Sequence, residues 1–116
     1  MHEVSVIEEI IEVVNDQIRE YPGKKVQSIT LKIGKFRNYV PDIMRFSWES
    51  MTKDTDLDGA SLKIIEIPVE LKCRDCKHVY QPEEYDFICP KCDSTHVDMN
   101  TGDELLLDSL ELIDTQ

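Results

Sequence analysis

The sequence lacks features that define several large classes of protein. No hydrophobic run approaches the roughly 18 residues that a membrane span requires, and the start, MHEVSVIEEI, has no basic segment of a secretory signal. Basic residues are few: 13 Lys and Arg stand against 24 Asp and Glu, a net charge of −11 over 116 residues. This acidity disfavours nucleic acid and anionic membranes as partners. We therefore expect a cytoplasmic protein.

Several motifs of enzymes and ion-binding loops are also missing. No G-x-x-x-x-G-K-[ST] sequence is present, so the P-loop route to GTP hydrolysis is excluded, and there is no G-x-S-x-G elbow. Residues 54–59 resemble the start of an EF-hand loop, but the position that needs a bidentate glutamate is Ile65. We interpret this stretch as an acidic turn.

The first twenty residues predict an amphipathic helix that ends near Pro22. Ser5 and Glu8 match a capping box, which leaves the start of the helix open between residue 1 and Ser5. Apolar residues recur at steps of three and four, which places them on one face of the helix. They are Val4, Ile7, Ile11, Val14 and Ile18.

The remaining periodic segments predict three strands and a second helix. Residues 26–33 alternate as a half-buried strand does, and Gly34 ends it. Pro41 suits the first turn of a helix that runs to about Lys53. Strands are expected at 61–67 and 104–113. Phe46, Trp48 and Met51 are expected to pack in the core.

Residues 69–101 differ from the rest of the chain because they hold all four cysteines and few aliphatic residues. Such a segment cannot form its own hydrophobic core, so we interpret it as an insert folded by something else. The predicted class is α+β, a small three-stranded sheet with two helices and an inserted four-cysteine zinc-binding domain. The predicted domains are 1–68 with 102–116, and 69–101.

The four cysteines form two C-x2-C pairs separated by twelve residues: Cys73, Cys76, Cys89 and Cys92. Two such pairs supply the four thiolates of a closed tetrahedral zinc site, in which the metal is structural. A disulfide framework would need an oxidising compartment, and a thioredoxin-like pair would leave the second C-x2-C unexplained. Zinc ribbons often bind nucleic acid, but acidic residues balance the basic ones near these cysteines.

The first three residues form a potential chelate. A free Met1 amine, the His2 backbone amide and the His2 imidazole offer three nitrogens, and Glu3 can add a fourth donor. Planar nitrogen and oxygen donors suit Ni(II) or Cu(II). The alternative is a solvated histidine at a frayed terminus. Three residues alone do not decide between them.

The whole series of motifs resembles the HypA/HybF family of nickel-insertion proteins for [NiFe]-hydrogenase maturation. The motifs are an opening MHE-V-S, an amphipathic helix, a strand ending in I-G and G-A-x-L-x-I before a proline. The double C-x2-C, G-D-E-L and a final L-x-S-L-E follow. They occur in this order over residues 1–113. The combination of MHE with the cysteine quartet is highly specific.

The resemblance implies a metallochaperone rather than an enzyme. It assigns nickel to Met1, His2 and Glu3, and structural zinc to Cys73, Cys76, Cys89 and Cys92. It implies delivery of nickel to the hydrogenase large subunit with a HypB-type GTPase and, in some organisms, supply of urease. The protein would be a monomer or a homodimer. The alternative that we keep is a zinc-ribbon adaptor without a nickel role.

The sequence departs from the family pattern at two places. Several members have an acidic residue before the second helix that can add a nickel ligand, and the matching position here is Val40, with Asp42 only a neighbour. Some members flank both cysteine pairs with histidine. Here His78 follows the first pair, but Asp93 follows the second and His96 lies further on. We interpret both histidines as surface residues, with a secondary role at the metal as the alternative.

Overall fold

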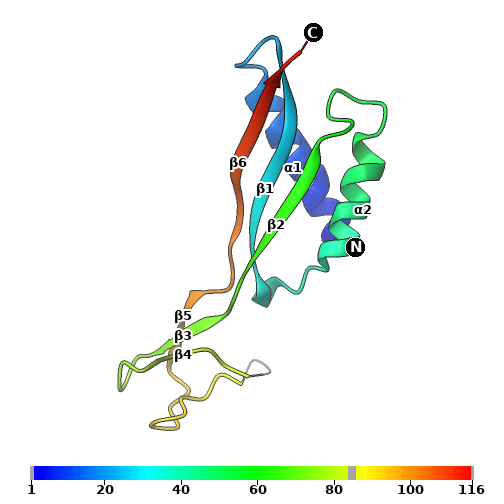
Figure 1. Cartoon of the computed structure of the whole chain (residues 1–116). Helices are drawn as coiled ribbons and strands as arrows, with labels where there is room; N and C mark the ends of the chain where they lie inside the picture. The colour runs from blue at the N-terminus through cyan, green and yellow to red at the C-terminus, as the bar shows by residue number, and fades with distance from the viewer. Residues whose placement is uncertain (1, 84–85, 116) are drawn as a thin grey trace. The chain divides into compact units, whose positions relative to one another are not determined.

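The computed structural model describes residues 2–83 and 86–115 (Figure 1). The helices are α1 (His2–Ile18) and α2 (Pro41–Thr52), with a 3-10 turn, η1 (Lys35–Arg37). One sheet has the strand order β2-β1-β6, and a second has the order β4-β3-β5. The strands are β1 (Lys24–Gly34), β2 (Ser61–Ile67), β3 (Glu70–Cys73), β4 (Val79–Tyr80), β5 (Val97–Thr101) and β6 (Leu105–Asp114). No helix among the described residues is long and apolar enough to cross a bilayer.

The predicted fold class is confirmed: two helices accompany a three-stranded sheet, and the four cysteines lie together in a separate small sheet region. The second sheet was not predicted, because strands of two to five residues are too short to show an alternating pattern. The chain divides into two compact units. The first contains residues 1–31, 39–65 and 106–116, and the second contains residues 32–38 and 66–105.

Helix α1 lies behind the sheet in Figure 1 and packs against α2. It begins at His2, so the capping box at Ser5 and Glu8 does not mark its start. Its buried side chains differ in part from the predicted ones, because the face that packs against the core is rotated by about one residue. The buried residues are Val6, Ile7, Ile10 and Val14, whereas Val4, Ile11 and Ile18 are half-buried.

Strand β1 is the central strand of the first sheet, and its alternation is as predicted at Ile29, Leu31 and Ile33, which are buried. Ser28, on the other side of the alternation, is also buried. Its hydroxyl donates to Glu111 of β6 at 2.7 Å, which satisfies the polar group. The strand ends at Gly34, where a Cβ atom would lie 2.0 Å from the backbone of Gly102.

Helix α2 starts at Pro41 as predicted, but only part of its expected apolar set is buried. Trp48 is 1% exposed, and its indole N–H donates to the Ala60 carbonyl at 2.8 Å. Phe46 is 70% exposed, so its prediction as a core residue is wrong. Two residues along an α-helix turn the side chain by about 200°, so Phe46 and Trp48 cannot share a face. Met51 is half-buried.

Candidate metal centres

The first cysteine pair sits in a tight turn at the end of β3. The backbone N–H of Cys73 donates to the His78 carbonyl at 2.9 Å, and the N–H of Lys77 donates back to the Cys73 carbonyl at 3.0 Å. Lys77 adopts a left-handed conformation with φ of 67°, which closes the turn. The N–H of Cys76 also points at the Cys73 sulfur, 3.5 Å away. The turn therefore brings both sulfurs of the pair to the same side.

The second cysteine pair forms the same turn, with equivalent backbone hydrogen bonds. The N–H of Cys89 donates to the Ser94 carbonyl at 2.9 Å, and the N–H of Asp93 donates to the Cys89 carbonyl at 2.9 Å. Asp93 is left-handed, with φ of 58°, in the place that Lys77 occupies in the first turn. Two sequence-distant segments thus adopt one local geometry, which is the arrangement that a shared ion with four ligands requires.

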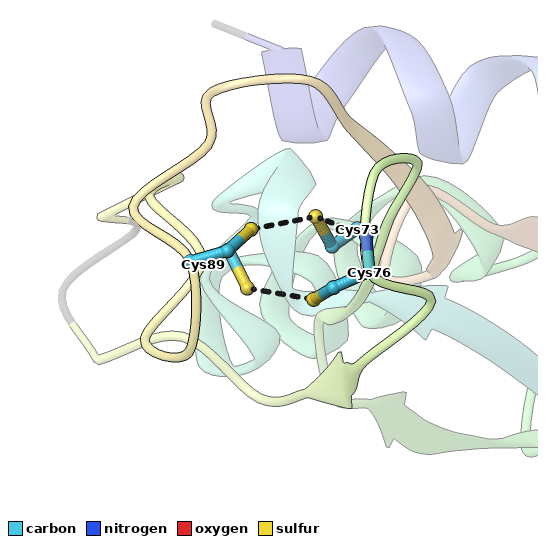
Figure 2. A group of neighbouring side chains, drawn as sticks. Cys73, Cys76 and Cys89 are labelled. Atoms are coloured by element: carbon cyan, nitrogen blue, oxygen red, sulfur yellow. Dashed lines mark hydrogen bonds between the residues drawn. The ribbon is translucent and has the colours of Figure 1, made fainter.

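The four sulfurs converge between the two turns (Figure 2). The sulfur of Cys73 lies 3.5 Å from that of Cys92, the sulfur of Cys76 lies 3.5 Å from that of Cys89, and all four lie within 4.8 Å of one another. Zn–S bonds of about 2.3 Å in a tetrahedron separate the sulfurs by about 3.8 Å. All four cysteines are free thiols. The donor set, its number and its spacing therefore fit a tetrahedral thiolate-bound cation.

The clustered thiols shift one another's pKa values in opposite directions. The Cys76 N–H lowers the pKa of Cys73 to about 6, with help from the neighbouring Cys92 thiol. At Cys92 the Ser94 N–H acts in the same direction, but the hydrogen bond with Cys73, burial and the other sulfurs outweigh it and raise the pKa to about 12. One thiolate thus forms readily while its neighbour keeps a proton. A bound cation would remove this conflict by stabilising all the thiolates.

Polar contacts connect the two turns outside the sulfur cluster. The Ser94 hydroxyl donates to the Asp75 carboxylate at 2.5 Å, and the backbone N–H of Arg74 donates to the His96 carbonyl at 2.8 Å. Arg74 also forms an ion pair with Asp98 at 2.6 Å. Sequence reasoning missed these connections, because each joins residues about twenty positions apart and none belongs to a recognised motif. They hold one cysteine pair opposite the other.

The two histidines near the cysteines do not join the sulfur cluster in the described part of the chain. His78 is half-buried and its ring stacks on Tyr80, with centroids 5.8 Å apart. His96 is exposed, and its Nδ1 lies 3.4 Å from the Asp75 carboxylate.

The N-terminal residues singled out by the sequence are partly described. His2 is the first residue of α1 and is exposed, and Glu3 follows it in the first turn. The Glu3 carboxylate accepts a hydrogen bond from the Val40 N–H at 3.0 Å, which lowers the pKa of Glu3. Asp42, in the first turn of α2, forms an ion pair with Arg45. Met1 lies outside the described residues.

Comparison with known protein families shows to which family this chain belongs. A family model described as HypA, hydrogenase/urease nickel incorporation, metallochaperone, matches residues 1–112. The chain belongs to the HypA family. Curated HypA proteins, each named hydrogenase maturation factor, support this at full length. The protein of Desulfatibacillum aliphaticivorans is 37% identical, and the match covers 100% of this chain and 90% of that protein. The protein of Geotalea uraniireducens is 36% identical, and the match covers 97% of this chain and 99% of that protein.

Solved structures of HypA proteins share the fold. The solution structure of the nickel metallochaperone HypA from Helicobacter pylori superimposes with a TM-score of 0.68 at 27% identity, covering 97% of this chain and 98% of that one. A second HypA solution structure gives a TM-score of 0.72 at 30% identity, covering 97% of each chain. The resemblance inferred from the order of motifs is therefore confirmed, and with it membership of a nickel-incorporation family.

Proposed function

We propose that this chain binds one Ni(II) ion at its N-terminus and delivers it to the large subunit of a [NiFe] hydrogenase. The observation that carries the proposal is the match to the nickel-incorporation family from residue 1, where the chain reads Met-His-Glu. Nickel is the cargo, so the protein acts as a carrier and not as an enzyme. Its working partners would be a HypB-type GTPase and the immature large subunit in the cytoplasm, with urease as a further recipient.

The proposed nickel ligands are nitrogens of Met1 and His2, with a fourth donor from Glu3. The exposure of His2 supports this assignment, because an incoming ion reaches the imidazole without unfolding the domain. The first four N–H groups of a helix have no partner within the helix. Deprotonation of the His2 and Glu3 amides therefore costs α1 no internal hydrogen bond. Planar nitrogen coordination of this kind suits Ni(II).

The proposed zinc ligands are the four clustered thiols. A closed set of four thiolates has no open position for water or substrate, so zinc here would support the fold and take no part in transfer. The small hydrophobic core around the cysteines supports this role, since a segment with so few buried aliphatic residues gains much of its folding free energy from the metal. We propose residues 69–101 as the domain that folds with zinc.

Nickel titration of the zinc-loaded protein tests the nickel site. The protein must carry its native N-terminus, checked by mass spectrometry, because a residual tag consumes the amine. We expect one Ni(II) to bind, and we expect His2→Ala and a one-residue insertion before His2 to weaken binding. The loss should exceed the roughly 10–100-fold cost of removing an outer-sphere partner, because ligands themselves are lost.

His96→Ala is the matched control, since it removes an exposed histidine from the cysteine-containing unit and should leave nickel affinity unchanged. Equal nickel binding by the wild type, His2→Ala and the insertion variant would overturn the N-terminal site. A chain that binds zinc but no nickel would instead be a zinc-ribbon adaptor.

A further inference from the structure

The hydroxyl of Tyr80 is a buried polar group that has no hydrogen-bond partner among the described residues. Tyr80 lies on β4, which pairs with β3 (Figure 1), and it stands directly opposite Leu71. Opposite residues of an antiparallel pair present their side chains on the same face, and so do residues two apart on one strand, such as Leu71 and Cys73. Both of these are buried. The tyrosine ring therefore shares the buried face of the small sheet with the first thiol of the cluster.

The tyrosine ring packs against the turn that carries Cys73. The imidazole of His78 stacks on it, with ring centroids 5.8 Å apart and ring planes 9° from parallel. The backbone carbonyl of His78 accepts the hydrogen bond from the Cys73 N–H at 2.9 Å. The stack and the strand pairing together hold the ring in one orientation, so the Tyr80 hydroxyl has to find its partner within the fold.

The sulfur cluster lies close to this hydroxyl. Burial raises the pKa of Tyr80, and negative charge on Cys89, Cys73, Asp86 and Cys92 raises it further, with Cys89 the strongest of the four. The effect of a charge falls with distance, so three of the four sulfurs are neighbours of the hydroxyl. Asp86 is exposed to water, whereas Cys89 and Cys73 are buried. An acceptor that shares the buried surroundings of the hydroxyl is therefore a sulfur.

A buried O–H group without an acceptor destabilises a fold, so it requires a physical explanation. Metal-bound thiolates carry negative charge, and hydrogen bonds from the groups around them tune the site. A tyrosine hydroxyl is a donor of this kind. We propose that the Tyr80 hydroxyl donates a hydrogen bond to the sulfur of Cys89 when the four thiolates hold zinc. Tyr80 does not bind the metal, and it is a positioning residue that acts through one of the ligands.

Two observations favour Cys89 over Cys73 as the acceptor. The charge of Cys89 acts most strongly on the hydroxyl, and the Cys73 sulfur already accepts the N–H of Cys76, 3.5 Å away. The hydrogen bond draws charge away from the Cys89 thiolate, which makes the metal harder to remove. Loss of an outer partner of this kind lowers metal affinity roughly 10–100-fold. The inference rests on the proposed zinc site and adds a residue outside its four ligands.

The test loads the full chain with cadmium-113, an NMR-active cation that also binds thiolates. We expect the Tyr80 hydroxyl proton to give a slowly exchanging signal with a scalar coupling to the metal, because this coupling reaches the proton only through a hydrogen bond to a ligand sulfur. Tyr80→Phe should remove the signal. Tyr21→Phe, which removes an exposed tyrosine hydroxyl from the first unit, is the matched control and should leave the signal unchanged.

Competition with a zinc chelator gives the second measurement. We expect Tyr80→Phe to bind zinc about tenfold or more weakly than the wild type, and Tyr21→Phe to bind it equally well. Asp86→Asn removes the other negative charge near the hydroxyl, and the coupling to cadmium should persist in it because the acceptor is a sulfur. Equal zinc affinity of Tyr80→Phe and the wild type would overturn the inferred role of Tyr80.

The outcomes also separate this inference from the proposed zinc site. A wild-type chain that binds neither zinc nor cadmium, measured by elemental analysis, overturns both. One bound metal ion without a coupled hydroxyl proton overturns the role of Tyr80 alone. A slowly exchanging hydroxyl proton that shows no coupling and is lost in Asp86→Asn assigns the bond to that carboxylate, and also overturns the inference. The coupling is measured on the wild type, so the test does not depend on whether Tyr80→Phe folds.

Discussion

The Oε2 atom of Glu3 accepts a hydrogen bond from the backbone N–H of Val40 at 3.0 Å. Val40 is the N-cap residue of α2 and has no side-chain oxygen with which to cap the helix. The Glu3 carboxylate therefore connects the first turn of α1 to the start of α2. At Val40 this chain offers a backbone N–H that holds the Glu3 carboxylate.

Replacing Glu3 should loosen the start of α2. In Glu3→Ala the Val40 N–H loses its acceptor, so we expect its hydrogen exchange to accelerate by about tenfold. Glu3→Gln keeps an acceptor oxygen and should show a smaller effect. NMR hydrogen exchange measures both, with Glu9→Ala on the exposed face of α1 as the control. Unchanged exchange at Val40 in Glu3→Ala would show that this hydrogen bond does not hold α2.

Trp48 and Phe46 should differ sharply in their contributions to stability. Trp48→Phe removes buried volume and leaves the Ala60 carbonyl without its N–H partner, so we expect a loss of about 2–4 kcal/mol in the free energy of unfolding. Phe46→Ala, on the same helix but 70% exposed, should change it by less than about 0.5 kcal/mol. Urea denaturation of the zinc-loaded protein measures both. A large effect of Phe46→Ala would mean that the ring is buried in solution.

The Glu111 carboxylate should make stability fall in acid. The Ser28 hydroxyl, and then Lys63, lowers the pKa of Glu111 below its ordinary value of 4.5. A carboxyl whose pKa is lower in the folded state stabilises the fold above its unfolded pKa, and this stabilisation is lost as the pH falls through the folded pKa. Glu111→Gln should therefore lose less stability than the wild type between about pH 7 and about pH 3.

Thermal unfolding at about pH 7 and about pH 3, followed by Trp48 fluorescence, measures how much stability the wild type and Glu111→Gln each lose in acid. Zinc release in acid affects both proteins alike, so their difference reports Glu111. Glu12→Gln, which removes one exposed carboxylate from α1, is the control and should follow the wild type. If Glu111→Gln has the same acid dependence as the wild type, the contacts of Glu111 contribute nothing to it.

Loss of one thiol should unfold the cysteine-containing unit and spare the other. We expect Cys73→Ala to lose zinc, measured by elemental analysis, and to lose the dispersed NMR signals of residues 66–105. The Trp48 indole signal should remain, because Trp48 lies in the first unit. His96→Ala should keep both its zinc and its spectrum. Collapse of the Trp48 signal in Cys73→Ala would mean that the domain boundaries proposed from the sequence are misplaced.

The sequence predicted the long elements and the cysteine site well because their signals are local and repeated. Eleven-residue β1 shows its alternation directly, and the Cys73 and Cys89 pairs carry a spacing that few other structures use. The helix period shows that Phe46 and Trp48 cannot both face the core, but which of the two is covered was not predictable, since it depends on the packing of α2 against α1. The Ser94–Asp75 contact was not predictable either, because only the folded turns bring these residues together.

The two repeated turns also determine which sulfurs a reagent can reach. In each pair the first cysteine, Cys73 or Cys89, is buried and the second, Cys76 or Cys92, is exposed. Alkylation and oxidation follow exposure as well as thiolate character. Solvent therefore reaches the sulfurs of Cys76 and Cys92, one on each turn, whereas the thiol with the lowered pKa, Cys73, is buried. A competing chelator would reach Cys76 and Cys92 before Cys73 and Cys89, because the backbone of the two turns determines which sulfurs are exposed.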